Sequence, residues 1–251
     1  MTPTPRVTGA VIARDEETTI AGCLRSLAWT DELLVIDSGS RDRTVEIARR
    51  SGARVEHRPF TNFAEQRNAA LDWAETEWVF FLDADERISR QLAAEARAAL
   101  ERPEAGFWIP RRNIILGHRM RGGGWWPDKQ LRLLRRERAR YDPAQGVHEV
   151  ARLDGPAGEL TSPIIHYNYR HLRQLFVKQW RYAQQDALDR VRRGERVRPH
   201  HLLAQPARAF HRRFIQWHGY RDGLLGLFLA GLLAWYELVT LLLVRRLEQN
   251  A

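Results

Sequence analysis

Two aspartates two positions apart, Asp83 and Asp85, follow the apolar run Trp78–Leu82 and are the residues best suited to chemistry in this chain. The run is too short for a free-standing helix and too apolar for an edge, so it predicts a central parallel strand buried on both faces. If the strand geometry continues, both carboxylates project to the same side. Mg²⁺ and Mn²⁺ prefer such oxygen ligands together with substrate phosphates, which predicts a divalent-metal site. The alternative is a strand end followed by a solvated acidic turn.

Strand and helix signals alternate through the first hundred residues. Short apolar, β-rich runs predict strands at 7–13, 33–36, 53–57 and 78–82. Segments with helical spacing predict helices at 18–27, 42–50, 62–74 and 89–100. Ser40 and Ser89 are the expected N-caps of the second and the last of these helices. The alternation predicts an α/β fold with a mostly parallel, doubly wound sheet flanked by helices.

Polar residues suited to a nucleotide follow three of the expected strands. They form the segments Ala13–Glu17, Asp37–Asp42 and Asp83–Glu86. Ligands of doubly wound sheets bind outside the carboxyl ends of the strands, where these segments would lie. Asp37 can accept hydrogen bonds from a base or a ribose, and Gly39 allows a tight turn into the helix. The same residues favour a capped turn in any protein, so turn chemistry alone is the alternative.

Four segments resemble the inverting family 2 glycosyltransferases, which have the GT-A fold. They are VIARDEETTIAGCLRSL, LLVIDSGSRDRTVEIA, FAEQRNAALDWAETEWVFFLDADERIS and GWWPDKQLRLLRR, the last followed by VHE. Within that family the chain most resembles the lipopolysaccharide-core β-1,4-glucosyltransferase group, over most of its length. The resemblance implies a GT-A (Rossmann-like) catalytic domain that uses a nucleotide-sugar donor.

The resemblance also implies roles for individual residues. Ala13, Glu16 and Asp37 would line the nucleotide site, with the adjacent Glu17 as the alternative to Glu16. Asp83 would lie near the ribose and phosphate, and Asp85 would bind the metal, as Mg²⁺ or Mn²⁺.

One histidine, His148, resembles the further metal or diphosphate contact of some GT-A enzymes. A neutral imidazole suits Mn²⁺ better than Mg²⁺. A lone histidine is more often a hydrogen-bonded structural residue than a ligand, and His166 presents the same two alternatives.

Glycosyl transfer needs charge stabilisation at the leaving diphosphate and one base for the acceptor hydroxyl. Arg67 or Arg132 would add a cationic contact to the diphosphate. The expected base is Asp128 in the segment GGWWPD, because the Trp125 and Trp126 rings beside it suit the apolar face of an acceptor sugar. A Pro-Asp turn is the alternative for Asp128, and Glu149 is the reserve candidate for the base.

The chain of 251 residues is long enough for one substantial core plus an appendage. We expect a catalytic domain at 1–169, with a nucleotide-sugar half at about 1–102 and an acceptor half at about 103–169, followed by a basic helical region at 170–251. The single Cys23 cannot form an internal disulfide, and no apolar leader with a cleavage pattern precedes the first strand. Both features favour a reducing, cytoplasmic setting.

The C-terminal region combines basic and apolar segments. The formal net charge is +9, and arginines recur from Arg170 to Arg221. The apolar stretch Gly223–Val244 is long enough to span a membrane, but Glu237 would be costly at bilayer depth. We therefore expect a helix or hairpin lying against the cytoplasmic face of the inner membrane, with arginines facing anionic lipid. The alternatives are a single span and a buried helix packed on the catalytic domain or on a second subunit.

Together with these features, the resemblance implies an inverting, metal-dependent transferase that moves a sugar from a UDP-sugar to a lipid-linked or lipopolysaccharide-core acceptor. The resemblance favours UDP-glucose as donor and a core heptose as acceptor, although the residues themselves leave both sugars and the metal open. The two other classes considered are a catalytically silent membrane scaffold and a basic nucleic-acid binder. The acidic strand ends and the apolar tail argue against nucleic acid. A nucleotidyltransferase is disfavoured because no glycine-rich phosphate loop follows the first strand.

Overall fold

The computed structural model describes residues 6–144 and 150–249. The chain divides into two compact units that interleave along the sequence: Met1–Arg111 with Lys129–His166, and Arg112–Asp128 with Tyr167–Ala251. We refer to them as the first and the second unit. The domain boundary predicted near residue 169 stays a prediction.

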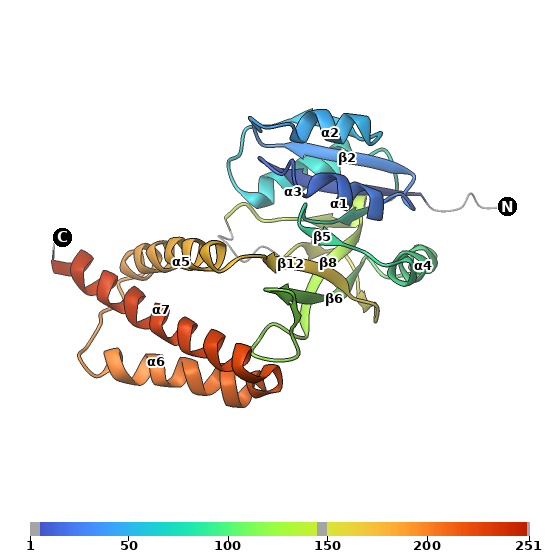
Figure 1. Cartoon of the computed structure of the whole chain (residues 1–251). Coiled ribbons are helices and arrows are strands. Elements are labelled where there is room, and N and C mark those ends of the chain that lie inside the picture. Colours follow the sequence, from blue (N-terminus) through green and yellow to red (C-terminus); the bar gives the residue numbers. More distant parts are fainter. Residues whose placement is uncertain (1–5, 145–149, 250–251) are drawn as a thin grey trace. The chain divides into compact units, whose positions relative to one another are not determined.

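The first unit begins with a parallel half-sheet (Figure 1). Its strands are β1 (Val7–Ala13), β2 (Glu32–Asp37), β3 (Arg54–His57) and β4 (Trp78–Phe81). They lie in the order β3-β2-β1-β4 and pair in parallel. The connecting helices are α1 (Ile20–Ser26), α2 (Thr44–Arg50) and α3 (Phe63–Trp73). The predicted strand–helix alternation is confirmed, and the carboxyl ends of the four strands share one edge of the sheet.

Beyond β4 the sheet becomes mixed, because β8 pairs antiparallel with β4. The sheet continues in the order β8-β6-β12-β5. The further elements before the C-terminal helices are β5 (Glu86–Arg87), α4 (Arg90–Ala99), β6 (Gly106–Ile115), β7 (His118–Arg119), β8 (Asp128–Arg135), η1 (Arg136–Arg138), β9 (Ala139–Arg140), β10 (Arg152–Leu153), β11 (Ala157–Glu159) and β12 (Ile164–Tyr169). The α/β fold class is confirmed, with the parallel order concentrated in the first four strands.

Strand β4 is buried on both faces, as its continuous apolar sequence predicts. Trp78, Phe80 and Leu82 pack into one hydrophobic cluster of the first unit. Val79 and Phe81 pack into the other. Alternate side chains of the run therefore enter different cores, which is why no polar residue interrupts it.

The helix starts show one correct and one wrong prediction. Ser89 caps α4, since its hydroxyl accepts a hydrogen bond from the Leu92 amide at 3.1 Å. Ser40 does not cap α2, because its hydroxyl instead accepts from the Asp15 amide of the neighbouring loop at 3.0 Å. Asp42 takes over at α2, where Oδ1 accepts from the Thr44 amide at 2.9 Å.

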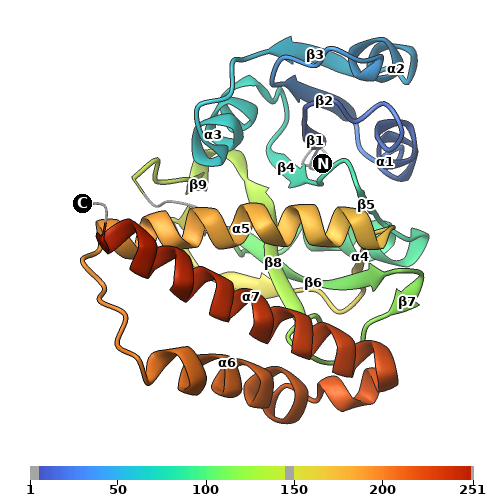
Figure 2. The ribbon, with the colours of Figure 1, turned by 60° about the vertical axis from the view of Figure 1, so that its left-hand side comes forward.

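The second unit contains the C-terminal helices, and the predicted helical region is confirmed (Figure 2). They are α5 (Leu172–Arg192), α6 (His201–His211) and α7 (Gly223–Gln249). The chain passes from α6 to α7 through a π-helical turn, η2 (Arg212–Gln216), and a 3₁₀ turn, η3 (Gly219–Asp222). Helix α7 packs against both α5 and α6.

Candidate active site

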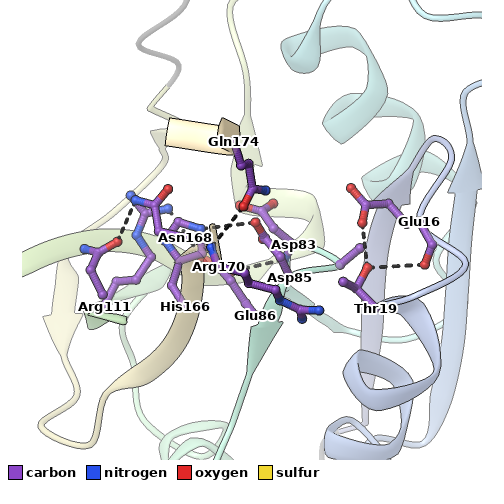
Figure 3. Close-up of polar contacts among 12 residues, drawn as sticks. Glu16, Thr19, Asp83, Asp85, Glu86, Arg111, His166, Asn168, Arg170 and Gln174 are labelled. Atoms are coloured by element: carbon purple, nitrogen blue, oxygen red, sulfur yellow. Dashed lines mark hydrogen bonds and ion pairs between the residues drawn. The ribbon is translucent and has the colours of Figure 1, made fainter. Parts of the chain in front are cut away.

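The segment Asp83–Glu86 forms a tight turn at the carboxyl end of β4 (Figure 3). The Glu86 amide donates to the Asp83 carbonyl at 2.9 Å, and the Asp83 amide donates to Glu86 Oε2 at 3.0 Å. The strand geometry therefore does not continue through Asp85, and the condition for placing both carboxylates on one side is not met. The two aspartates take different partners.

Asp83 is held by the buried guanidinium of Arg132, whose side chain is 3% exposed. Both carboxylate oxygens accept from Arg132, at 3.1 and 2.5 Å. Arg132 also lies 3.4 Å from the fully buried carboxylate of Glu86. The guanidinium of Arg111 pairs with the same carboxylate at 3.3 Å. These contacts form a buried ionic network of two carboxylates and two guanidinium groups.

The network sets the ionisation state of Asp83. Burial alone would raise the pKa of the Asp83 carboxyl, but the guanidinium of Arg132 outweighs this effect and holds the pKa well below its usual range. The charges of Arg67 and Arg111 act in the same direction. Asp83 is therefore a fixed negative charge, and its side chain remains 40% exposed at this edge of the sheet.

Asp85 points to a different partner, since its Oδ2 lies 3.3 Å from Nε2 of His166. His166 lies on β12, where it pairs with Glu86 of β5. Among residues 6–144 and 150–249, no group of three or more His, Cys, Asp or Glu side chains is arranged around a metal position. A Mg²⁺ or Mn²⁺ ion needs only one or two carboxylates when substrate phosphates and water complete its shell, so the Asp85–His166 pair fits such an ion.

The structure thus brings His166, for which the sequence left a ligand role and a structural role open, next to the predicted metal ligand. His148 and Glu149 lie outside the described residues, so their predicted roles stay predictions. The pairing of β12 with β5 joins residues 81 positions apart, which local sequence patterns do not reveal.

Asp37 lies at the end of β2, opposite Ala13 in the register of β1. Its carboxylate accepts from the amides of Gly39 at 3.1 Å and Ser40 at 3.2 Å, and it lies 3.0 Å from Nδ1 of His57. Gly39 adopts a φ of 90°, which favours glycine. The carboxylate builds the turn, as the turn alternative predicts, and its contact with a donor nucleotide stays a prediction.

The two adjacent acids after β1 face different neighbours. Oε2 of Glu16 accepts from the Thr19 hydroxyl at 2.5 Å (Figure 3). Glu17 pairs instead with the exposed Arg43. Arg87 donates to the Thr19 carbonyl at 2.7 Å and also to the carbonyl of Ala84, so the Glu16 loop is tied to the turn that carries Asp83 and Asp85.

Arg67 lies on α3, with its guanidinium 5.3 Å from the centre of the Tyr141 ring. The positive charge of Arg67 lowers the pKa of the Asp83 carboxyl, so Arg67 acts on the Asp83–Glu86 turn through its charge. The terminal nitrogens of Arg132 are already engaged by carboxylates. Of the two arginines predicted to contact a diphosphate, Arg67 is the one with less direct engagement in the network.

Asp128 is the first residue of β8 and lies in the second unit. Its carboxylate lies at the end of a chain of hydrogen bonds from two asparagine side chains. Asn113 donates to Asp128 Oδ2 at 3.3 Å and to the Trp125 carbonyl at 3.0 Å. Asn168 in turn donates to Oδ1 of Asn113 at 3.1 Å. Both asparagines are buried, so this chain orients the Asp128 carboxylate. Neither asparagine was identified from the sequence.

The two tryptophans beside Asp128 differ in environment. The Arg112 guanidinium lies over the Trp126 ring, 3.4 Å from its centre. Trp125 meets Tyr169 edge to face at 6.2 Å and packs against the hydrophobic cluster of the second unit. Packing thus accounts for Trp125, whereas Trp126 presents a half-buried indole with a cation above it. Sugar binding by either ring stays a prediction.

Residues 10–152, which include the Asp83–Glu86 turn and Asp128, match the profile of Glycosyl transferase family 2. The chain belongs to this family. It is therefore a glycosyltransferase, and the alternatives of a nucleic-acid binder and a silent scaffold are set aside. The parallel half-sheet with its acidic carboxyl edge agrees with the GT-A fold expected from the resemblance.

Two glycosyltransferases are similar to this chain over different lengths. It is 30% identical to the lipopolysaccharide core biosynthesis glycosyltransferase LpsC of Rhizobium meliloti, over 96% of this chain and 92% of LpsC. It is 36% identical to an uncharacterized glycosyltransferase of Rickettsia conorii, over 37% of this chain and 33% of that protein.

Solved structures show weaker likeness. S. aureus TarS 1–349 matches with a TM-score of 0.48 and 16% identity, covering 72% of this chain and 65% of TarS 1–349. Glucosyl-3-phosphoglycerate synthase of Mycobacterium tuberculosis, in complex with Mn²⁺, UDP and glucosyl-3-phosphoglycerate, matches with a TM-score of 0.48 and 21% identity, covering 68% and 75% of the two chains. With TM-scores below 0.5, these likenesses assign neither a donor nor a metal.

The ionic network makes a prediction about stability and pH. The pKa of Asp83 is lower in the folded chain than in the unfolded chain, where it is about 3.9. Ionised Asp83 therefore stabilises the fold above the unfolded pKa, and this contribution is lost as pH falls toward the folded pKa. We expect Asp83→Asn to lower the free energy of unfolding by roughly 1–3 kcal/mol between about pH 5 and 8, less than for a fully buried pair.

Urea denaturation of wild type and Asp83→Asn at a series of pH values measures this difference, which should shrink below about pH 4. Glu159→Gln is the control, because it removes an exposed ion pair with Lys129 and should change stability by less than about 1 kcal/mol. A difference that grows toward acid pH would show that the pKa is raised instead.

Proposed function

We propose that this glycosyltransferase is an inverting enzyme that transfers a sugar, with glucose favoured, from a UDP-sugar to a lipopolysaccharide-core or lipid-linked acceptor. The observation that carries the proposal is the Asp83–Glu86 turn at the carboxyl edge of the parallel strands. There Arg132 holds Asp83 ionised, and Asp85 lies next to His166. The similarity to LpsC along nearly the whole chain supports the choice of acceptor class.

On the donor side, the proposal assigns the nucleotide to the edge formed by Ala13, Glu16 and Asp37. Ala13 and Asp37 are register partners at the ends of neighbouring strands, and the Glu16 loop is tied to the Asp83 turn through Arg87. Asp83 then faces the ribose and phosphate as a fixed acceptor of hydrogen bonds. Arg67 supplies positive charge for the diphosphate.

The proposed cofactor is a divalent cation, Mg²⁺ or Mn²⁺, held by Asp85 with His166 beside it. When bound, it supplies Lewis-acid stabilisation of the negative charge that develops on the leaving diphosphate. The imidazole of His166 favours Mn²⁺ over Mg²⁺ if its nitrogen joins the metal directly. His148 remains a further candidate for the same role.

On the acceptor side, Asp128 is the proposed base, with Glu149 in reserve. Its carboxylate takes the proton of the acceptor hydroxyl while that oxygen attacks the anomeric carbon from the face opposite the diphosphate, which inverts the centre. The hydrogen bond from Asn113 fixes the orientation of the carboxylate. Trp126, with Arg112 above its ring, offers the surface for an acceptor sugar and for a negative substituent on it.

We place the enzyme at an anionic membrane surface, on the cytoplasmic face. Within the described residues, one helix is long and apolar enough to cross a membrane, Gly219–Gln249, and only 28% of its most apolar window is buried. Leu224 is 86% exposed at the start of α7, and Leu203 on α6 is 81% exposed. Such exposed apolar side chains among arginines favour a helical hairpin in the lipid interface.

The charge of Glu237 is compensated within the second unit. Arg190 on α5 donates to both carboxylate oxygens of Glu237, at 2.9 and 3.2 Å, and it also pairs with Asp186. The cost that Glu237 would impose near lipid is thus reduced by an ion pair between α5 and α7. Because this pair joins α7 to α5, it supports a packed helical region that lies on the membrane surface rather than an α7 that inserts alone.

The metal assignment predicts the behaviour of Asp85→Ala. This variant should lose the metal-dependent part of UDP-glucose binding, so that its Kd in Mn²⁺ approaches the value in chelator. His166→Gln should weaken the same binding by about tenfold, because it alters a group beside the metal ligand rather than the carboxylate. Isothermal titration with UDP-glucose, UDP and GDP measures both effects.

Glu159→Gln, on an exposed strand edge, is the control for these titrations. If Asp85→Ala binds UDP-glucose in Mn²⁺ as tightly as wild type, the metal assignment is wrong.

The base assignment predicts that Asp128→Asn keeps donor affinity but lowers kcat by about 10²–10⁴-fold, since the amide cannot accept the hydroxyl proton. The measurement is transfer of labelled glucose from UDP-glucose to a deacylated lipopolysaccharide core. Asp154→Asn is the control, because this residue is exposed on a turn of the first unit. Near-normal turnover by Asp128→Asn would move the base elsewhere, with Glu149→Gln as the next variant.

The membrane assignment predicts that Leu203→Glu with Leu224→Glu reduces cosedimentation with phosphatidylglycerol vesicles by about tenfold or more. Both positions are exposed, so the fold should survive, whereas deletion of α7 would remove the buried Leu229 and Leu241 from the core. Added salt should weaken wild-type binding because the arginine contribution is screened. Leu203→Ser with Leu224→Ser is the milder matched pair. Unchanged sedimentation of the glutamate variant would place the membrane contact elsewhere.

A further inference from the structure

The triple-glycine loop Gly122–Gly124 packs directly against the turn that joins α6 to α7. The Gly123 amide donates to the Trp217 carbonyl at 2.6 Å, and Arg213 donates to the Gly123 carbonyl at 3.2 Å. A Cβ on Gly122 would lie 2.2 Å from the carbonyl oxygen of His218. The loop therefore needs glycine for this close approach of two backbones.

A buried carboxylate, that of Asp222, closes the same contact. Its side chain is 0% exposed. Its Oδ1 accepts from the Arg121 amide at 2.9 Å and lies 2.9 Å from Nε2 of His118, while its Oδ2 accepts from the Gly122 amide at 2.9 Å. Hydrogen bonds to an ionised acceptor are stronger than neutral ones, and a buried carboxylate without them would be costly. Asp222 thus fixes two consecutive peptide units, through the amides of Arg121 and Gly122.

Hydrogen bonds continue from Gly122 to the proposed base. The Trp125 amide donates to the Gly122 carbonyl at 3.0 Å. The Trp125 carbonyl accepts from Asn113 at 3.0 Å, and the same Asn113 amide group donates to Asp128. A continuous series of contacts within the second unit therefore leads from Asp222 to Asp128.

We propose that Asp222 is a positioning residue for glycosyl transfer: it holds the loop Gly122–Asp128 in the conformation that orients the Asp128 carboxylate and the Trp126 ring. This inference rests on the proposed acceptor role of that loop. Asp222 acts through the backbone of Arg121 and Gly122. Three consecutive glycines have many accessible conformations, so the loop depends on contacts from outside its own sequence to adopt one of them.

The test compares Asp222→Asn with wild type by amide hydrogen exchange and by kinetics. Asparagine keeps the shape but replaces one acceptor oxygen by an N–H₂ group, which faces a donor and cannot bond to it. We expect exchange in the peptide covering 122–128 to accelerate at least tenfold, with exchange in α7 unchanged. We also expect acceptor kcat/KM to fall about ten- to hundredfold while the Kd for UDP-glucose stays the same. Asp189→Asn, which changes a partly exposed ion pair with Arg192 on α5, is the control.

The outcomes separate positioning from general stability. Equal exchange in wild type and Asp222→Asn, or normal acceptor kinetics, would overturn the proposal. Faster exchange throughout the second unit together with a lowered Tm would also overturn it, by showing a purely structural role. His118→Ala removes only the side-chain contact to Asp222 and should give a smaller effect in the same loop, which keeps the test valid if Asp222→Asn fails to fold. If wild type transfers no sugar, the exchange result still tests the loop contact while the proposed function fails separately.

Discussion

The buried guanidinium of Arg132 is the interaction on which the acidic edge of the sheet depends. It lies on an antiparallel strand next to β4 and meets the carboxylates of both Asp83 and Glu86. Without it, the carboxylates of Asp83 and Glu86 would repel each other, and water could screen only the partly exposed Asp83. With it, the turn can keep one acid fully buried and another ionised and partly exposed. The β-strand therefore ends in a tight turn, and the ion pairs with Arg132 stabilise that turn.

The turn gives different partners to Asp83 and Asp85, two aspartates that look equivalent in the sequence. Asp83 is committed to Arg132, which makes it a fixed charge and a rigid reference point for the turn. Asp85 is directed toward His166 from β12 instead. A carboxylate tied to a guanidinium is a poorer metal ligand than one beside an imidazole, since the guanidinium already compensates its charge. The proposed division into a donor contact and a metal ligand follows from these partners.

Much of the first unit could be predicted from the sequence because its signals are local. The run Trp78–Leu82 has no polar residue because alternate side chains enter two cores, and Ser89 caps α4 through an amide three residues away. Predictions failed or were absent where the partner is distant. The sequence predicts Ser40 as a cap because a helix follows it, but its hydroxyl accepts a hydrogen bond from the Asp15 amide instead. His166, Asn113 and Asp222 likewise acquire their contacts only when separate strands and helices come together.

The contact between Asp222 and the glycine loop also bears on the order in which the chain folds. Its partners are separated by 100 residues in the sequence, and the loop Gly122–Gly124 meets the carbonyl groups of Trp217 and His218. During synthesis the parallel half-sheet can form as soon as β4 has left the ribosome, because its strands and helices are consecutive. The loop has its partners only after the turn before α7 has also emerged. The proposed acceptor side is thus completed last, so a chain that stops before Asp222 lacks the residues that hold the loop beside the proposed base.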